Sequence, residues 1–300
     1  MKFMRRICVS VICAVALIFA AVLPVRAQEK NQDKIDVVAS FSILGDFVKN
    51  VGGDRISVTT LVGPNGDAHV YTPTPLDAKK ISDARLVVVN GFGFEGWLPR
   101  LVKSSGGKAV IVTATNGIVQ RELDAHADPH AWQSVVNART YVANIRDAMV
   151  AADPAGAEAY KANADAYLIK LDALDREVRT AIAGIPEAHR KVISTHDAFG
   201  YFAAAYGIAF IAPQGVSTES EASARDLAKI ISQIKASKIP AVFLENISDP
   251  RLMRRIAAET GAKIGGTLYS DSLTQENGDA PTYIDMVRHN IKALTSALTS

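Results

Sequence analysis

Short apolar runs rich in β-branched residues alternate with helix-period segments along most of this 300-residue chain. This alternation restricts the fold more than any other feature of the sequence. Strands that alternate with helices form parallel sheets covered by helices on both faces. The sequence therefore predicts an α/β protein. The alternation occurs in two series, with strands predicted at 35–39, 56–62, 86–90 and 109–113, and then at 192–195, 208–212, 241–245 and 263–267.

The longest helical pattern lies between the two series. Apolar residues recur there at spacings of three and four from Tyr160 to Ile182. Asp153 suits an N-cap and Pro154 a first helical position. About 30 residues at 1.5 Å each give a rod of about 45 Å. Two interpretations fit this length: a long helix on the surface of one domain, or a helix that joins two lobes.

The first 27 residues are typical of a secretory signal peptide. Basic residues precede the apolar run 7–23, and Val25 and Ala27 place small side chains at the −3 and −1 positions of a cleavage site before Gln28. The alternative is an uncleaved membrane anchor, for which the run is short of the roughly 20 residues that a span needs. We predict cleavage and a periplasmic location.

Both cysteines, Cys8 and Cys13, lie inside this segment. Neither has the leucine and small residues that precede the modified cysteine of a lipoprotein, so we predict a protein that is not lipid-anchored. The rest of the chain has no cysteine and offers no disulfide and no thiolate ligand. Removal of four basic residues with the signal peptide leaves 29 basic and 31 acidic residues. A chain without basic excess indicates no nucleic-acid partner.

Four loops each display one potential metal ligand near the end of a predicted strand. In the first, 63–75, two glycines and a proline precede the histidine and predict a tight exit from the strand. In open α/β sheets, ligands bind outside the carboxyl ends of the strands. Three imidazoles and one carboxylate suit a tetrahedral metal site if the fold brings them together. The candidate ligands are His69, His130, His196 and Asp271.

Each candidate also has a purely structural alternative. A loop histidine such as His69 is commonly a solvated surface residue, and His130 is able to cap a turn. His196 is able to hydrogen-bond within its own strand end, and Asp271 suits an Asx turn or a helix cap. The joint pattern, rather than any single residue, favours the metal site.

These four segments, in this order, resemble the metal-binding family of ABC-transporter substrate-binding proteins, the zinc and manganese receptors. The resemblance includes Val242–Asn246 and Glu259–Leu273 and covers essentially the whole chain after residue 27. It implies two α/β lobes, each with two of the four ligands, and a metal site in the cleft between them. It also favours the joining helix over the surface helix. The implied boundaries are 28–152 for the first lobe, 153–185 for the long linking helix and 186–300 for the second lobe.

The resemblance implies a function as well. The protein is expected to be a periplasmic receptor, not an enzyme, that captures a divalent cation and delivers it to an ABC permease in the inner membrane. We expect a monomer that receives its ion directly or from a periplasmic metal chaperone. A long rigid helix implies little motion between the lobes.

The identity of the metal is less constrained than the site. Within the family, a histidine at the place of His196 favours zinc, whereas a glutamate favours manganese. Many zinc receptors of the family carry a long histidine-rich loop shortly before the position of His130. This chain lacks such a loop, and this absence, together with Asp271, is compatible with either a zinc or a manganese receptor. His126 is the one histidine in that region, and we interpret its segment as an ordinary acidic turn rather than an accessory site. We predict Zn²⁺, with Mn²⁺ as the alternative, since zinc binds nitrogen and oxygen ligands more tightly than manganese does.

The competing class of protein is a zinc-dependent hydrolase. Catalytic zinc keeps one coordination position open for water and has a general base nearby. The chain has no His-Glu-x-x-His motif, and four protein ligands close the site. It also has no Gly-x-Ser-x-Gly motif for a serine hydrolase. A surface adhesin is disfavoured by the predicted lack of a lipid anchor or sorting signal.

Overall fold

The computed structural model describes residues 34–123 and 126–299. The predicted signal peptide and both cysteines lie outside the described residues, so the predicted cleavage before Gln28 stays a prediction. Among the described residues, every helix is too short or too polar to cross a membrane.

The first sheet contains four parallel strands in the order β2-β1-β3-β4. The two central strands are the most covered: β1 is buried along most of its length and β3 throughout, whereas β4 at the edge is half-buried to exposed. The strands are β1 Ile35–Phe41, β2 Ile56–Val62, β3 Leu86–Val89 and β4 Val110–Thr113. The helices that follow the first three are α1 Ser42–Gly52, α2 Pro75–Asp83 and α3 Leu98–Ser105.

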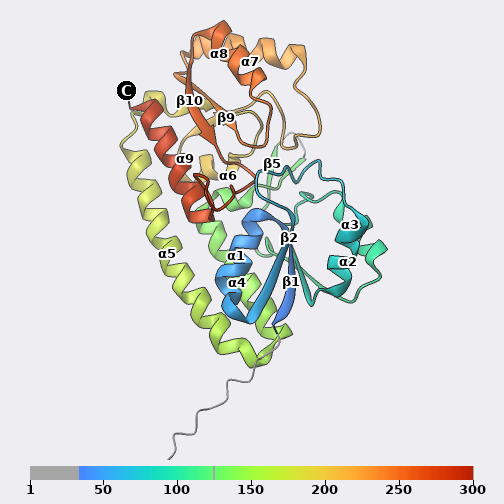
Figure 1. Cartoon of the computed structure of the whole chain (residues 1–300). Coiled ribbons are helices and arrows are strands. Elements are labelled where there is room, and N and C mark those ends of the chain that lie inside the picture. Colours follow the sequence, from blue (N-terminus) through green and yellow to red (C-terminus); the bar gives the residue numbers. More distant parts are fainter. Residues whose placement is uncertain (1–33, 124–125, 300) are drawn as a thin grey trace, which may run out of the picture. The chain divides into compact units, whose positions relative to one another are not determined.

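The second sheet also has four parallel strands, in the order β10-β9-β7-β8. Figure 1 shows β9 and β10 with α7 and α8 beside them, and α9 running alongside α5. The strands are β7 Lys191–Ile193, β8 Ala209–Ile211, β9 Ala241–Glu245 and β10 Lys263–Leu268. The helices are α6 Gly200–Tyr206, α7 Ala224–Ser237, α8 Arg251–Thr260 and α9 Tyr283–Leu298.

Two helices and a hairpin connect the sheets. The hairpin pairs β5 Arg121–Leu123 with β6 His126–Asp128, and the sequence pattern did not predict it because its strands are short and polar. The helices are α4 Val135–Ala152 and α5 Ala157–Ala183. At 27 residues, α5 is about 40 Å long, and it packs against α1, α4 and α9.

The start of α5 differs from the prediction. Residues Pro154–Gly156 form a 3-10 turn, and Asp153 makes no capping hydrogen bond with its side chain. Its carboxylate instead accepts hydrogen bonds from Arg55 at 2.7 Å and from the hydroxyl of Tyr160 at 2.7 Å. Asp153 therefore pairs with an arginine distant in sequence instead of capping the helix, and in this pair both the donor and the acceptor are charged.

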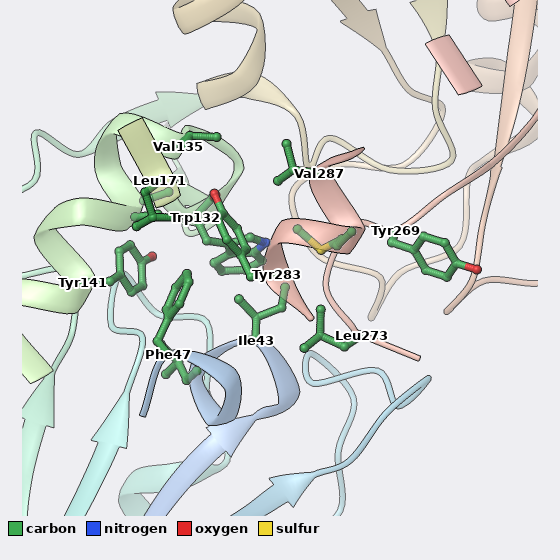
Figure 2. Packing of buried hydrophobic residues seen from close by; sticks show 14 of the residues in the cluster. Ile43, Phe47, Trp132, Val135, Tyr141, Leu171, Tyr269, Leu273, Tyr283 and Val287 are labelled. Atoms are coloured by element: carbon green, nitrogen blue, oxygen red, sulfur yellow. The ribbon is translucent and has the colours of Figure 1, made fainter. Parts of the chain in front are cut away.

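One continuous apolar core extends from the first sheet, across α1, α4, α5 and α9, to the second sheet. Figure 2 shows its centre, where Ile43 and Phe47 of α1 lie near Tyr283 of α9 and Trp132. The ring centroids of Phe47 and Tyr283 are 4.8 Å apart, and the hydroxyl of Tyr283 donates to the carbonyl of Trp132 at 2.6 Å. The predicted fold class, α/β with parallel sheets flanked by helices and one long helix, is confirmed. The predicted lobe boundaries stay a prediction.

Candidate metal centre

The fold brings all four predicted ligands to one point. Each of the four lies in a loop after a strand: His69 after β2, His130 after β6, His196 after β7 and Asp271 after β10. One ligand atom from each side chain lies within 4.8 Å of all the others. Parallel strands present their carboxyl ends on the same edge, so loops from the two sheets are able to meet there.

The distances between the ligand atoms fit a tetrahedral ion. Oδ2 of Asp271 lies 3.2 Å from Nε2 of His69 and 3.2 Å from Nε2 of His196. Nε2 of His130 lies 3.3 Å from Nε2 of His69 and 3.6 Å from Oδ1 of Asp271. Ligand bonds of about 2.0–2.1 Å place the corners of a regular tetrahedron about 3.3 Å apart. These four separations are close to that value, and all four ligand atoms lie within 4.8 Å of one another, so the group is of a size that suits one zinc ion.

The four ligand side chains are almost completely withdrawn from water. His130, His196 and Asp271 are fully buried, and the side chain of His69 is 4% exposed. Within the described residues, neither oxygen of Asp271 has a hydrogen bond of good geometry, and the same is true of Nε2 of His196. Buried polar atoms normally have hydrogen-bond partners. Three orphaned atoms that face one point indicate a site for a cation.

His130 is held by the carboxylate of Asp128. Oδ1 of Asp128 accepts the backbone N–H of His130 at 3.0 Å and lies 2.9 Å from its Nδ1. Its other oxygen, Oδ2, lies 3.7 Å from Nε of Arg121. A carboxylate on Nδ1 fixes the tautomer of an imidazole and leaves Nε2 free to bind a metal.

His196 is held in the same way by Glu245, at the end of β9. Nδ1 of His196 lies 2.6 Å from Oε2 of Glu245. Oε1 of Glu245 accepts the backbone N–H groups of Thr195 at 2.7 Å and His196 at 3.1 Å, and Oε2 accepts the hydroxyl of Ser270 at 2.8 Å. Glu245 thus holds both His196 and Ser270, the residue before Asp271.

The sequence alone did not assign these two carboxylates to the site. The available signal was weak: Asp128 precedes a candidate histidine by two residues, and Glu245 ends an apolar strand. The partner of Glu245 lies 49 residues away in the chain, so only the sheet order β9-β7 reveals the pair.

The charges in the site form a buried ion pair. Burial lowers the pKa of the His130 imidazole, and the nearby carboxylates of Asp271 and Asp128 only partly offset this. Burial also acts to lower the pKa of His196, but the charges of Glu245 and Asp271 outweigh it and raise that pKa well above its usual value. Burial acts to raise the pKa of Asp271, but His196 and His130 outweigh it and lower that pKa well below the usual range.

His69 differs from the other ligands in its surroundings. Its backbone N–H donates to Oδ1 of Asp67 at 2.9 Å, which closes an Asx-type turn. Its ring packs edge-on against Phe94, with centroids 4.7 Å apart. His69 also lines a cavity of about 340 Å³, whereas the other three ligands are fully buried. The site is therefore most accessible on the side of His69.

His126, which the sequence analysis considered for an accessory metal site, is exposed on β6. In the part of the chain that the structure describes, it joins no group of three or more side chains with metal-ligand spacing. Nothing in the described residues therefore supports an accessory metal site at His126.

Comparison with known proteins identifies the family. Residues 37–297 match the sequence model of the ZnuA family, described as the periplasmic component A of a zinc-uptake complex. The chain belongs to this family. As a ZnuA-family member it is a metal-binding substrate-binding protein of the kind that acts with the permease of an ABC transporter, and the predicted resemblance is confirmed.

Individual relatives in the ZnuA family differ in the metal that their names give. The manganese-binding lipoprotein MntA of Halalkalibacterium halodurans is 35% identical over 299 residues, which cover 99% of this chain and 100% of the relative. The iron-binding protein YfeA of Yersinia pestis is 34% identical, with 93% and 91% covered. The structure of the periplasmic zinc-binding protein TroA of Treponema pallidum superposes with a TM-score of 0.86 at 31% identity, and covers 89% of this chain and 100% of its own. Family membership thus leaves the choice between zinc and manganese open.

The prediction that the protein is not lipid-anchored is wrong. The relative MntA and several streptococcal members of the ZnuA family, which match most of this chain, are named lipoproteins. The prediction depended on the residues around Cys8 and Cys13, which lie outside the described residues. A short sequence context at the start of the chain was therefore a poorer guide than whole-chain similarity.

Proposed function

We propose that this protein captures one divalent transition-metal ion through His69, His130, His196 and Asp271 and delivers it to its ABC permease. The observation that supports this most is the convergence of four ligand atoms, one from each side chain, to within 4.8 Å of one another. The carboxylates behind His130 and His196 add to it, because each keeps an Nε2 directed at the centre.

Zinc is the proposed cargo. Three imidazoles and one carboxylate at tetrahedral spacing match its usual ligands and geometry, and zinc lies far above manganese in intrinsic affinity. Manganese is the second candidate for a specific reason. Both oxygens of Asp271 lack hydrogen bonds of good geometry within the described residues, so the carboxylate is able to bind through both and to raise the coordination number above four.

We also propose that the bound ion is cargo and not a catalyst. Catalytic zinc needs a coordination position for water, whereas here four protein groups surround the centre and three of them are fully buried. Failure of the zinc-loaded protein to hydrolyse esters, amides and phosphates would agree with this. The monomeric state and the delivery of the ion by a periplasmic metal chaperone stay predictions.

The first test is a competitive titration of the metal-stripped protein with Zn²⁺ and Mn²⁺ against chelators of known strength. One tight equivalent of zinc, lost in His69→Ala and His196→Ala, would support a zinc receptor. His126→Ala is the matched control, because His126 is exposed and outside the ligand group, and it should bind as the wild type does. Manganese that stays bound in the presence of competing zinc would move the assignment to manganese. No stoichiometric metal would overturn the proposed site.

A further inference from the structure

The segment 214–218, which follows β8, connects the loops of two proposed ligands. At one end its backbone is bonded beside His196: the N–H of Gln214 donates to the carbonyl of Thr195 at 3.3 Å, and the N–H of Asp197 donates to the carbonyl of Gly215 at 3.1 Å. The segment is therefore fixed to the strand end that carries His196.

At its other end the same segment is bonded to the loop of His69. The hydroxyl of Thr218 donates to Oδ2 of Asp67 at 2.6 Å. Oδ1 of the same carboxylate accepts the backbone N–H of His69 at 2.9 Å. Asp67 thus links the loop of His69 to Thr218, which lies 151 positions after Asp67 in the chain.

The segment 214–218 also borders open space. Val216 and Ser217 line the cavity of about 340 Å³ that His69 reaches. Gln214 and Thr218 line a second cavity, of about 500 Å³, together with Asp67. A segment that lines two cavities is able to shift with less disturbance of packed side chains.

The loop that carries Asp271 is held more firmly. There the N–H of Asn65 donates to the carbonyl of Leu273 at 2.9 Å, and the N–H of Leu273 donates to the hydroxyl of Ser42 at 2.9 Å. Trp132 and Gln133 both donate to the carbonyl of Ser270, next to Asp271. The apolar core that joins the two sheets lies behind these contacts, so opening on this side would disrupt buried packing.

From these contacts we propose that the metal ion enters and leaves past His69, and that Thr218 is a positioning residue that controls its departure by holding Asp67. The inference rests on the proposed function of the four ligands. Loss of the Thr218 hydrogen bond frees segment 214–218 at one end and loosens the turn that presents His69. A hydrogen bond to a charged acceptor is strong enough to change a dissociation rate about tenfold.

The test measures the rate of metal loss from the zinc-loaded protein after mixing with excess chelator, with stopped-flow detection. Thr218→Val keeps the shape of the side chain and removes the hydroxyl. We expect about tenfold faster dissociation, one bound equivalent and an association rate that is not reduced. Thr218→Ser, which keeps a hydroxyl, should restore the slow rate. Ser217→Ala is the matched control, since Ser217 lines the same cavity but does not bind Asp67.

Two results would overturn the inference while the proposed function stands. One is a dissociation rate in Thr218→Val within twofold of the wild type. The other is an equal acceleration in Ser217→Ala, which would show that the segment acts by its general packing. Absence of metal binding by the wild-type protein would instead overturn the proposed function, and the inference with it.

Discussion

Glu245 and His196 lie in a contact of 2.6 Å between Oε2 and Nδ1, buried at the edge where β9 and β7 end. The contact orients Nε2 of His196 toward Asp271, 3.2 Å away. It also puts a negative charge behind a ligand that has to be deprotonated before it binds a metal. The first two predictions follow from this pair.

Replacement of Glu245 by glutamine should weaken metal binding about 10–100-fold, the usual effect of losing a residue that orients a metal ligand. The glutamine amide is able to donate to Nδ1 of His196, and this would place the imidazole proton on Nε2, where the metal binds. Competitive titration measures the change. The control is Glu259→Gln on the exposed face of α8, where Glu259 pairs with Arg255. Unchanged affinity in Glu245→Gln would show that the carboxylate serves packing alone.

Metal binding near pH 6.5 should release about one proton, from His196. Its pKa is raised well above 6.5 in the metal-free protein, whereas His130 and Asp271 are already in their metal-binding forms. Between pH 6.5 and the raised pKa of His196, the apparent binding constant should therefore rise about tenfold per pH unit. Calorimetry in buffers with different heats of ionisation counts the protons. A count near zero would contradict the raised pKa.

The same ion pair should stabilise the metal-free protein in a defined pH window. The raised pKa of His196 gives stability that is complete below its usual value of 6.5 and is lost as the pH rises through the raised value. The lowered pKa of Asp271 gives stability that is present above 3.8 and is lost as the pH falls through the lowered value. Without metal, the free energies of unfolding of wild type and Asp271→Asn should differ most between pH 3.8 and 6.5. A difference that grows above pH 8 would contradict the assignment.

Replacement of Gly200 by alanine should weaken metal binding about tenfold, although Gly200 lies on α6 and binds no ligand. A methyl group there would lie 2.5 Å from Oδ2 of Asp128 and 3.2 Å from Nε of Arg121. Asp128 would have to move, and His130 with it. Glycine-to-alanine changes in helices usually stabilise by about 1 kcal/mol, so stability alone would not reveal the damage. Gly96→Ala, with open space around its Cβ, is the control, and equal affinities in the two variants would refute the coupling.

Replacement of Asp153 by asparagine should lower the free energy of unfolding by about 1 kcal/mol and leave metal affinity unchanged. Burial acts to raise the pKa of Asp153, but Arg55 and Tyr160 outweigh it and lower that pKa. The stabilisation is therefore lost in acid. Chemical denaturation at pH 7 and pH 3 measures both values. A loss of metal affinity in this variant would mean that the start of α5 is coupled to the site.

Most of the fold was predictable because it depends on local patterns. Each of the eight predicted strands begins and ends within two residues of its prediction. The helix α3 begins only at Leu98, because the backbone takes positive φ angles at Gly91, Phe92 and Gly93 and residues 91–97 are not helical. The β5–β6 hairpin could not be predicted from the sequence, because its short polar strands show no alternation of apolar residues.

The α/β alternation, the long helix and the four candidate metal ligands could be predicted from the sequence, because each depends on residue type and short-range spacing. The contacts of Glu245 with His196 and of Thr218 with Asp67 could not be predicted in this way. Each of the pairs Glu245–His196 and Thr218–Asp67 joins residues at least 49 positions apart. Such pairs depend on sheet order and on the packing of one sheet's loops against the other's, which no local pattern encodes.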